Sequence, residues 1–334
     1  MAFREVSLNK KGNLFVNYWT VVKKLSGLLF KTKVVYIPAL NQGSAPISIL
    51  LSKLMGRKVI TDMLISSFDT VTDDRKIAKK RSLRALKAYV ADYVCVKLSD
   101  KIICDTEKHK EYFVEHYKCG EDKVLVIPVG SEDIFKPIPV KRYREDSFNV
   151  LFYGGFSPMH GIDKILMAAK ELDGKENVHF VLVGGGQTKD EMLQLADRLR
   201  LTNVEFIDFV PYEQLPAFIN SFDAGLGIFG ETGKAFRVVP NKVYQMASCG
   251  KAIITLDTPG IREVFSDDRD IVLVPTQENN AQGIAKQIMR LKQDMAATNS
   301  IGDAAYALME QRLSHPYLQA CFEQAVAGLE GGRR

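Results

Sequence analysis

Short apolar runs alternate with amphipathic segments along the second half of the chain. The runs have strand length and are almost continuously hydrophobic, and they cover residues 148–155, 178–186, 204–209, 224–229, 251–256 and 271–274. Between them, apolar positions recur at helical spacing over 161–172, 188–200, 213–221 and 241–249. Gly250 follows the last segment and is well placed as a C-terminal cap. The alternation predicts a Rossmann-like α/β domain, because near-continuous apolar strands need a parallel sheet covered on both faces.

The first half alternates in the same way, though less completely. The predicted strands cover 33–38, 57–62, 101–104 and 123–127, and the predicted helices cover 14–30, 45–55, 76–98 and 106–117. Three prolines and a charge cluster within 128–147 indicate a domain boundary. We therefore expect one Rossmann-like domain over 1–140 and another over 147–313. An amphipathic helix over 314–330 is expected to pack back on the first domain.

The composition is that of a soluble globular protein. Apolar residues make up 46% of the 334 positions and charged residues 25%, which excludes a disordered chain, a collagen-like fibre and a small disulfide scaffold. No apolar run reaches the roughly 18 residues of a membrane-spanning helix, and the first residues lack the pattern of a secretory signal. The five cysteines are widely spaced and form no CxxC pair. We expect reduced thiols in a cytosolic protein, without structural zinc.

The charge is distributed unevenly along the chain. Residues 1–140 hold 24 Lys and Arg against 15 Asp and Glu, and within residues 1–90 the count is 17 against 5. A basic half suggests an anionic partner such as a phospholipid surface, a nucleic acid or a phosphorylated ligand. The predicted helix over 76–98 has a strongly cationic face that could lie against anionic lipid. A solvated basic surface without a specific partner is the alternative. The sequence contains no known nucleic-acid-binding module that would support a nucleic acid as the partner.

Two glycine-rich loops follow predicted strands and are candidates for phosphate contact. Gly154 and Gly155 precede His160 in one loop, and Gly185 is the centre of the other. Glycines after a strand let backbone amides approach a phosphate, and a helix beginning after such a loop directs its positive end there. Neither loop has the spacing of a dinucleotide fingerprint or a P-loop. Tight turns also need glycine, so a purely structural role stays open.

Three cations, Lys234, Arg237 and Lys242, lie within nine residues after an apolar run. They precede a predicted helix for which Asn241 is a natural N-cap. Cations near a helix N-terminus are disfavoured by the helix dipole unless an anion lies among them. This concentration of charge therefore favours a bound diphosphate, with a solvated basic loop as the alternative.

In the first half, carboxylates gather after the predicted strand 57–62. Asp62 and Asp69 could orient sugar hydroxyls or act as a base on an acceptor hydroxyl. His109 lies one turn into a helix that Thr106 would cap, and it is a third candidate catalytic residue. Turn and capping roles are the alternative for the acidic residues. No metal-binding constellation is evident in the sequence.

The second half resembles the donor-binding domain of the GT-B-fold, family 4 (group 1) bacterial glycosyltransferases. The resemblance covers most of 148–266 and rests on LFYGGFSPMHGIDKIL, FVLVGGGQT, LTNVEFIDFVPYEQLPAFINSFDAGLGIFG and VVPNKVYQMASCGKAIITLDTPGIREVF. It is similar upstream to a bacterial branch through Asp62…Ser66, Phe68-Asp69-Thr70…Asp74-Arg75 and Asp105-Thr106…His109…Tyr112-Phe113. The resemblance implies two Rossmann-like domains that face each other across a cleft.

Carried onto these positions, the resemblance implies a set of donor contacts. Phe209 and Val210 would read the nucleobase through their backbone. The arginine and lysine that usually hold the diphosphate fall on Gly155 and His160, and the usual pair of glutamates falls on Arg237 and Gln245. We therefore expect Lys234, Arg237 and Lys242 to replace the lost charge, and Gln245 to hold the ribose.

Compared with the family, the chain opens without the usual first strand and glycine loop, about fifty residues in all. Either the sequence starts inside a longer protein, or the first domain is reduced. The resemblance implies transfer of a hexosyl unit from a nucleotide-diphosphate sugar to a lipid-linked or polysaccharide acceptor in surface glycan biosynthesis, with retention and without metal or cofactor. The expected location is the cytoplasm, at the inner face of the membrane. The alternatives are a non-catalytic GT-B-like subunit that binds a nucleotide or a partner, and a nucleotide-sugar epimerase of the same fold.

Overall fold

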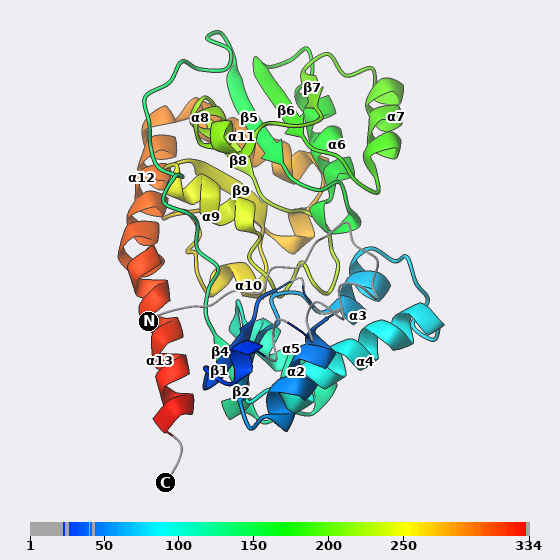
Figure 1. Cartoon of the computed structure of the whole chain (residues 1–334). Coiled ribbons are helices and arrows are strands. Elements are labelled where there is room, and N and C mark those ends of the chain that lie inside the picture. Colours follow the sequence, from blue (N-terminus) through cyan, green and yellow to red (C-terminus); the bar gives the residue numbers. More distant parts are fainter. Residues whose placement is uncertain (1–22, 24–26, 40, 42–43, 332–334) are drawn as a thin grey trace. The chain divides into compact units, whose positions relative to one another are not determined.

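A computed structural model describes residue 23, residues 27–39, residue 41 and residues 44–331 (Figure 1). The predicted helix over 14–30 lies mostly outside these residues. The chain divides into two compact units, one of Met1–Pro128 with Leu318–Arg334 and the other of Val129–Tyr317. We call them the first and second unit and describe each by itself.

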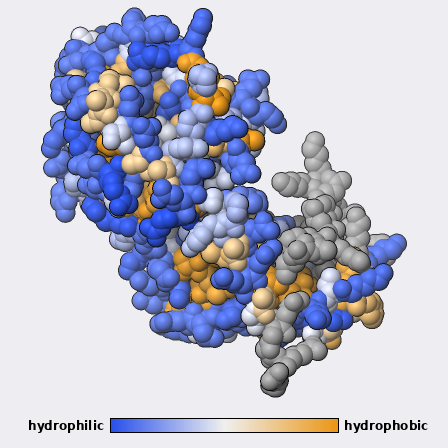
Figure 2. Space-filling model, turned by 90° about the vertical axis from the view of Figure 1, so that its left-hand side faces the viewer, coloured by the Kyte–Doolittle hydropathy of each residue, from blue (hydrophilic) through white to orange (hydrophobic). Residues whose placement is uncertain are grey.

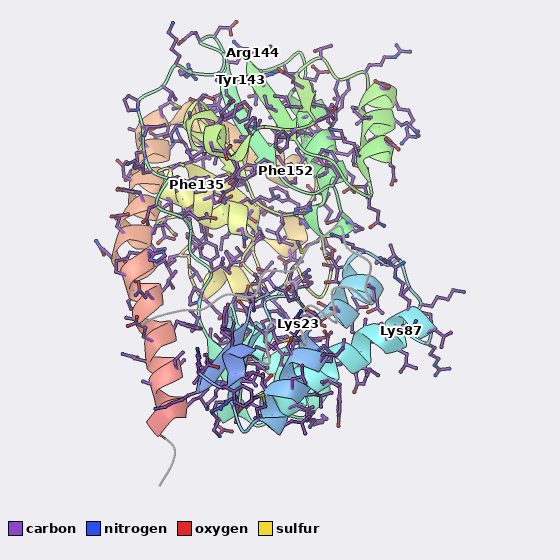
Figure 3. All side chains as sticks on the ribbon, in the orientation of Figure 1. Lys23, Lys87, Phe135, Tyr143, Arg144 and Phe152 are labelled. Carbon is purple, nitrogen blue, oxygen red and sulfur yellow. The ribbon has the colours of Figure 1, made fainter. Side chains whose placement is uncertain are left out.

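The boundary lies earlier than expected, because residues 129–147 belong to the second unit. Arg142 forms an ion pair of 2.8 Å with Asp223, and the ring of Tyr143 stacks on Phe222 at 4.8 Å between centroids. Figure 3 labels Tyr143 in this segment. The segment with the prolines and the charge cluster is therefore packed on the second unit and is not a free linker.

The first unit contains a parallel sheet in the order β1-β2-β3-β4. Its strands are β1 (Val34–Ile37), β2 (Lys58–Asp62), β3 (Lys101–Cys104) and β4 (Val124–Val126). Its main helices are α2 (Ala45–Leu54), α4 (Leu83–Leu98) and α5 (Glu107–Tyr117). The four predicted strands are confirmed. Helix α13 (His315–Gly331) buries Val326 against Ile60 and Ile103 of this sheet.

The predicted helix over 76–98 was wrong in its first part, since α4 begins only at Leu83. Lys76 has a left-handed φ of 51°, which interrupts a helix. Ser82 is the N-cap, and its side chain accepts a hydrogen bond from the Ala85 amide. The chain before it forms a short helix, α3 (Ser67–Asp69), and a π-helical turn over Thr70–Asp74.

The second unit contains a six-stranded parallel sheet in the order β10-β9-β8-β5-β6-β7. Its strands are β5 (Phe148–Tyr153), β6 (Val178–Val183), β7 (Val204–Ile207), β8 (Ala224–Leu226), β9 (Ala252–Leu256) and β10 (Val272–Val274). All six predicted strands are confirmed. The predicted helices correspond to α6 (Ile162–Leu172), α7 (Lys189–Leu199), α8 (Leu215–Asn220) and α9 (Asn241–Ser248).

Three helices of the second unit were not predicted: α10 (Pro259–Arg262), α11 (Ala281–Gln293) and α12 (Met295–Arg312). Helix α11 buries Ile284 and Ile288 in the same core as Ile165 of α6. Every side chain of β5 is buried, as expected for a central strand covered on both faces.

The described surface is mostly hydrophilic, but hydrophobic residues of the first unit also reach it, as Figure 2 shows. Among the described residues, no helix combines the length and the hydrophobicity that crossing a bilayer requires.

Candidate functional site

The sheet of the second unit changes direction between β5 and β8. From β5 the chain adds β6 and β7 on one side, whereas β8, β9 and β10 lie on the other. In an open parallel sheet, ligands bind outside the carboxyl ends of the strands at such a switch point. The loops that leave β5 and β8 there, together with helix α9, carry most of the predicted donor-binding residues.

These two loops are held together through their backbones. The amide of Phe229 donates to the carbonyl of His160 at 3.1 Å, and the amide of Gly230 donates to the carbonyl of Met159 at 3.1 Å. Gly161 has a φ of +61°, and a Cβ there would lie 2.6 Å from the amide nitrogen of Gly230. Only glycine allows this approach, so the position of His160 is fixed relative to the loop after β8.

The glycines that were predicted to approach phosphate divide into two kinds. A Cβ on Gly184 would lie 2.1 Å from the carbonyl oxygen of Gly154, so the two glycines permit the loops after β5 and β6 to touch. Gly155 and Gly185 are exposed, and nothing lies within 4 Å of a Cβ on Gly185. Gly184 is therefore needed for the contact between the two loops. At Gly155 and Gly185 the backbone is exposed, so that a ligand can approach it.

Lys242 is a buried cation at the start of α9. The residue is 6% exposed, and no described group forms a hydrogen bond with its Nζ atom. That atom lies 3.7 Å from the centroid of the Phe152 ring, and a Cβ on Gly154 would be 3.0 Å from it. Figure 3 labels Phe152, the residue of β5 that carries this ring. Burial holds the pKa of Lys242 well below its usual value, because a charged amine is costly to desolvate without a partner.

His160 lies beside this amine. Its Nδ1 atom is 3.0 Å from the hydroxyl of Ser157, and the residue is buried. Burial, followed by the positive charges of Lys242 and Lys234, holds the pKa of His160 well below its usual value. The imidazole is therefore a neutral hydrogen-bonding group beside two lysine side chains, and it cannot supply the charge of the lysine usual at this position.

The remaining predicted cations are turned inward or held close to the backbone. Lys234 is only 9% exposed, and a Cβ on Gly233 would lie 3.1 Å from Nη1 of Arg237. The prediction that Asn241 caps α9 was wrong: Pro240 is the N-cap, and Asn241 is the first helical residue and is exposed. Proline suits this helix start because its missing amide hydrogen leaves no donor unsatisfied.

Gln245, predicted to hold the ribose, belongs to a chain of hydrogen bonds. The hydroxyl of Tyr153 donates to Oε1 of Gln245 at 2.9 Å, and Nε2 of Gln245 donates to the hydroxyl of Tyr212 at 3.3 Å. Tyr212 in turn donates to Glu132 at 2.5 Å. Burial and this carboxylate raise the pKa of Tyr212 to about 12.

Tyr153, Tyr212 and Glu132 were not predicted from the sequence. Tyr153 could have been found as a polar-ended residue at the carboxyl end of a predicted strand. Glu132 has no sequence pattern around it that indicates a binding residue, and it lies in the segment that was predicted to contain the domain boundary.

Phe209 and Val210 follow β7, which lies two strands from β5 in the sheet. The side chain of Phe209 is 75% exposed. An exposed aromatic ring beyond the carboxyl end of a strand is free to contact a ligand.

In the first unit, Asp62 ends β2 and keeps a polar environment. Its Oδ2 atom accepts a hydrogen bond of 2.9 Å from the hydroxyl of Tyr36, and its Oδ1 atom accepts one of 2.9 Å from the Leu64 amide. Burial raises the pKa of this carboxyl, which favours the protonated form. The ring of Tyr36 also contacts Phe322 of α13, edge to face at 5.0 Å.

The other two candidate catalytic residues are enclosed. His109 is 1% exposed; its Nδ1 atom lies 2.7 Å from Asp105, and its ring stacks on Phe113 at 4.7 Å. His109 was predicted as a candidate catalytic residue, but the helix α5 that Thr106 caps encloses its ring. Asp69 is likewise buried, and its amide donates to Ser66.

The family model of group 1 glycosyl transferases matches residues 134–308, more than half of the chain. A chitobiosyldiphosphodolichol beta-mannosyltransferase of Candida albicans is 20% identical over 253 residues, which cover 67% of this chain and 54% of that protein. An uncharacterized glycosyltransferase of Methanocaldococcus jannaschii, MJ1178, is 23% identical over 214 residues, covering 61% and 53%. The chain thus spans about half the length of these curated relatives.

Solved structures show the same fold. A sucrose-phosphate synthase of Thermosynechococcus elongatus has a TM-score of 0.75 at 16% identity, over 97% of this chain and 80% of that one. Anabaena Alr3699/HepE in complex with UDP and glucose has a TM-score of 0.73 at 17% identity, over 96% and 83%. The two parallel α/β sheets described above match the architecture of GT-B glycosyltransferases.

Proposed function

Because the chain belongs to the group 1 glycosyl transferases, we propose that it transfers a hexosyl unit from a nucleotide-diphosphate sugar to a lipid-linked or polysaccharide acceptor. The proposal includes retention of configuration, no metal ion and a place in surface glycan biosynthesis at the inner face of the membrane. It is supported by the mannosyltransferase among the relatives and by the UDP bound to a structural neighbour.

One observation carries the proposal. The Nζ atom of Lys242 is buried without a hydrogen-bonding partner among the described residues. It lies at the switch point of the sheet, beside Gly154 and His160. An enclosed amine in this position needs an anion to become a stable cation. A diphosphate provides one, and the backbone at Gly155 and Gly185 is open beside it.

The proposed chemistry is electrostatic. Breaking the bond between sugar and phosphate leaves negative charge on the nucleotide diphosphate, and Lys242, Lys234 and Arg237 would stabilise that charge. Neutral His160 would contribute a hydrogen bond from its ring. Gln245 would meet the ribose within the chain formed by Tyr153 and Tyr212, and Phe209 would lie at the base. Asp62 with Tyr36 would bind an acceptor hydroxyl.

The test is the affinity for UDP, GDP and ADP measured by calorimetry on the full chain and on Lys242→Met. We expect the tightest nucleotide to lose roughly ten- to hundredfold in affinity, the value of one hydrogen bond to a charged group. Lys175→Met is the matched control, since Lys175 is exposed in the same unit. Equal affinities for Lys242→Met and the parent protein would contradict the assignment.

A non-catalytic, nucleotide-binding subunit is the second candidate. It is favoured by Gly155 and the neutral His160, which leave both usual cation positions without charge. Hydrolysis of a panel of nucleotide sugars, with and without membranes, distinguishes the two. A protein that binds a nucleotide diphosphate yet neither hydrolyses nor transfers any of the sugars would support the subunit.

A further inference from the structure

Helix α4 exposes apolar residues on one side while burying the other. Its enclosed face is made of Ala85, Asp92, Cys95 and Val96. The opposite face exposes four large apolar side chains: Leu83 at 77%, Leu86 at 55%, Val90 at 50% and Tyr93 at 42%. Their spacings of three and four residues put them in one line along the helix. We call this line the α4 stripe.

The segment that leads into the helix is strongly cationic. Between Asp74 and Asp92 the chain carries seven cations and no acidic residue. All seven are exposed: Arg75, Lys76, Lys79, Lys80, Arg81, Arg84 and Lys87. Figure 3 shows Lys87 projecting from the first part of α4. The stripe therefore begins inside a concentrated positive field.

This combination fits a particular kind of partner. An apolar stripe beside a dense cluster of cations is typical of helices that lie in the headgroup region of a membrane, where apolar side chains enter the acyl boundary and cations meet lipid phosphates. An apolar protein partner would explain the stripe but not the seven exposed cations, of which Lys80 forms an ion pair of 3.1 Å with Asp73. A nucleic acid would explain the cations but not the exposed leucines and valine.

We propose that the α4 stripe and the cations of residues 75–87 form a docking surface for an anionic phospholipid bilayer. Leu83 and Leu86 enter the headgroup region, and the helix lies along the membrane plane. The docking surface would bring the protein to the bilayer that contains a lipid-linked acceptor. In this respect the inference rests on the proposed function. The corresponding sequence-based expectation attributed the contact to charge alone, whereas the structure adds exposed apolar side chains.

Flotation of the full chain with vesicles tests the proposal. We expect binding to phosphatidylcholine vesicles that contain phosphatidylglycerol, and much weaker binding to pure phosphatidylcholine. The double variant Leu83→Ser/Leu86→Ser should bind about tenfold more weakly or worse, because two leucines no longer leave water. Replacing Lys79 and Lys80 by serine should cost up to about fivefold per cation, and added salt should weaken binding further.

The control is Met167→Ser/Leu193→Ser. It removes two large apolar residues of the second unit that are exposed to a smaller extent than Leu83 and Leu86, at 43% and 37%, and it should leave flotation unchanged. Both apolar variants change surface residues only, and circular dichroism checks their fold. The docking surface is supported if Leu83→Ser/Leu86→Ser loses flotation and Met167→Ser/Leu193→Ser keeps it.

Three results would overturn it: no flotation of the parent protein with anionic vesicles, equal flotation of Leu83→Ser/Leu86→Ser, or a dimer in gel filtration that this variant dissociates while no chain binds vesicles. UDP calorimetry on the same samples separates this outcome from that of the proposed function. The stripe variant should keep its UDP affinity, and Lys242→Met should keep its flotation. A parent protein that floats but binds no nucleotide would leave the docking surface standing alone.

Discussion

At Lys242, burial and charge oppose each other. The side chain packs over an aromatic ring, which stabilises a cation to some extent, yet no described hydrogen-bond acceptor faces its Nζ atom. Desolvation therefore favours the neutral amine in the free protein. A bound diphosphate reverses this preference, since a dianion nearby raises the pKa of the amine.

This reversal predicts that nucleotide binding takes up a proton. Between the depressed pKa of Lys242 in the free protein and the higher pKa in the complex, the affinity should fall by up to about tenfold per pH unit as the pH rises. Below the lower pKa the affinity no longer depends on this group. Calorimetry at about pH 8, where the terminal phosphate has already lost its second proton, in two buffers of different ionisation enthalpy measures the uptake.

Lys242→Met is the control, since His160 is a second titratable group beside the site. The variant should lose the buffer dependence of the binding heat. A buffer dependence of equal size in the variant would show that Lys242 does not take up the proton.

The sequence predicted Lys242 for a sound physical reason: cations gather at a helix start only when an anion offsets the dipole. It did not predict the burial of that lysine, which depends on Phe152 and on the loop after β5. His109 shows the converse. Its position one turn into the helix after a strand made it a candidate catalytic residue, but its contact with Asp105 and its stacking on Phe113 depend on packing that spacing does not reveal.

At the scale of elements, the carboxylate of Asp92 links α4 to the start of α3. It accepts hydrogen bonds from the amides of Ser67 and Phe68 and from the hydroxyls of Ser66 and Tyr117. A fully buried carboxylate thus serves as the N-terminal partner of a short helix. This contact fixes the segment that follows Asp62.

Asp92→Asn should lower the free energy of unfolding by about 2–4 kcal/mol, because an amide group replaces an oxygen that faces several donors. Asp73→Asn is the matched control. Asp73 is 39% exposed in its ion pair with Lys80, so its loss should cost less than about 1 kcal/mol. Urea unfolding followed by circular dichroism compares the two. Equal costs would show that the buried carboxylate does not hold α3.

Strands were predicted well, and helices less well. Ten apolar runs correspond to the ten strands of the described residues, because a covered parallel sheet requires continuous hydrophobicity. The start of α4 was misplaced because periodicity continues through Lys76, whose left-handed backbone leaves no trace in the pattern. The long helices α11 and α12 were missed, although Ile284 and Ile288 recur at helical spacing.

At the scale of the whole molecule, each unit has its own sheet and its own buried core. The proposed diphosphate contacts lie entirely within the second unit. A ligand that binds only one folded unit stabilises that unit by mass action, by about 2.7 kcal/mol at a concentration one hundred times its dissociation constant.

We therefore predict that UDP, or whichever nucleotide diphosphate binds most tightly, raises the unfolding temperature of the second unit. Differential scanning calorimetry, with limited proteolysis to identify the unit that remains folded, measures the shift. Lys242→Met should abolish most of it, and Lys175→Met should not. A shift confined to the first unit would contradict the assignment of the donor site.

The return of α13 to the first sheet has a consequence for biosynthesis. Val326 packs against Ile60 and Ile103, residues that leave the ribosome long before it. The intervening segment, Val129–Tyr317, is a compact unit, and domains generally fold as units. The earlier half must wait for its closing helix, so the part of the protein that is made first is the last to be finished.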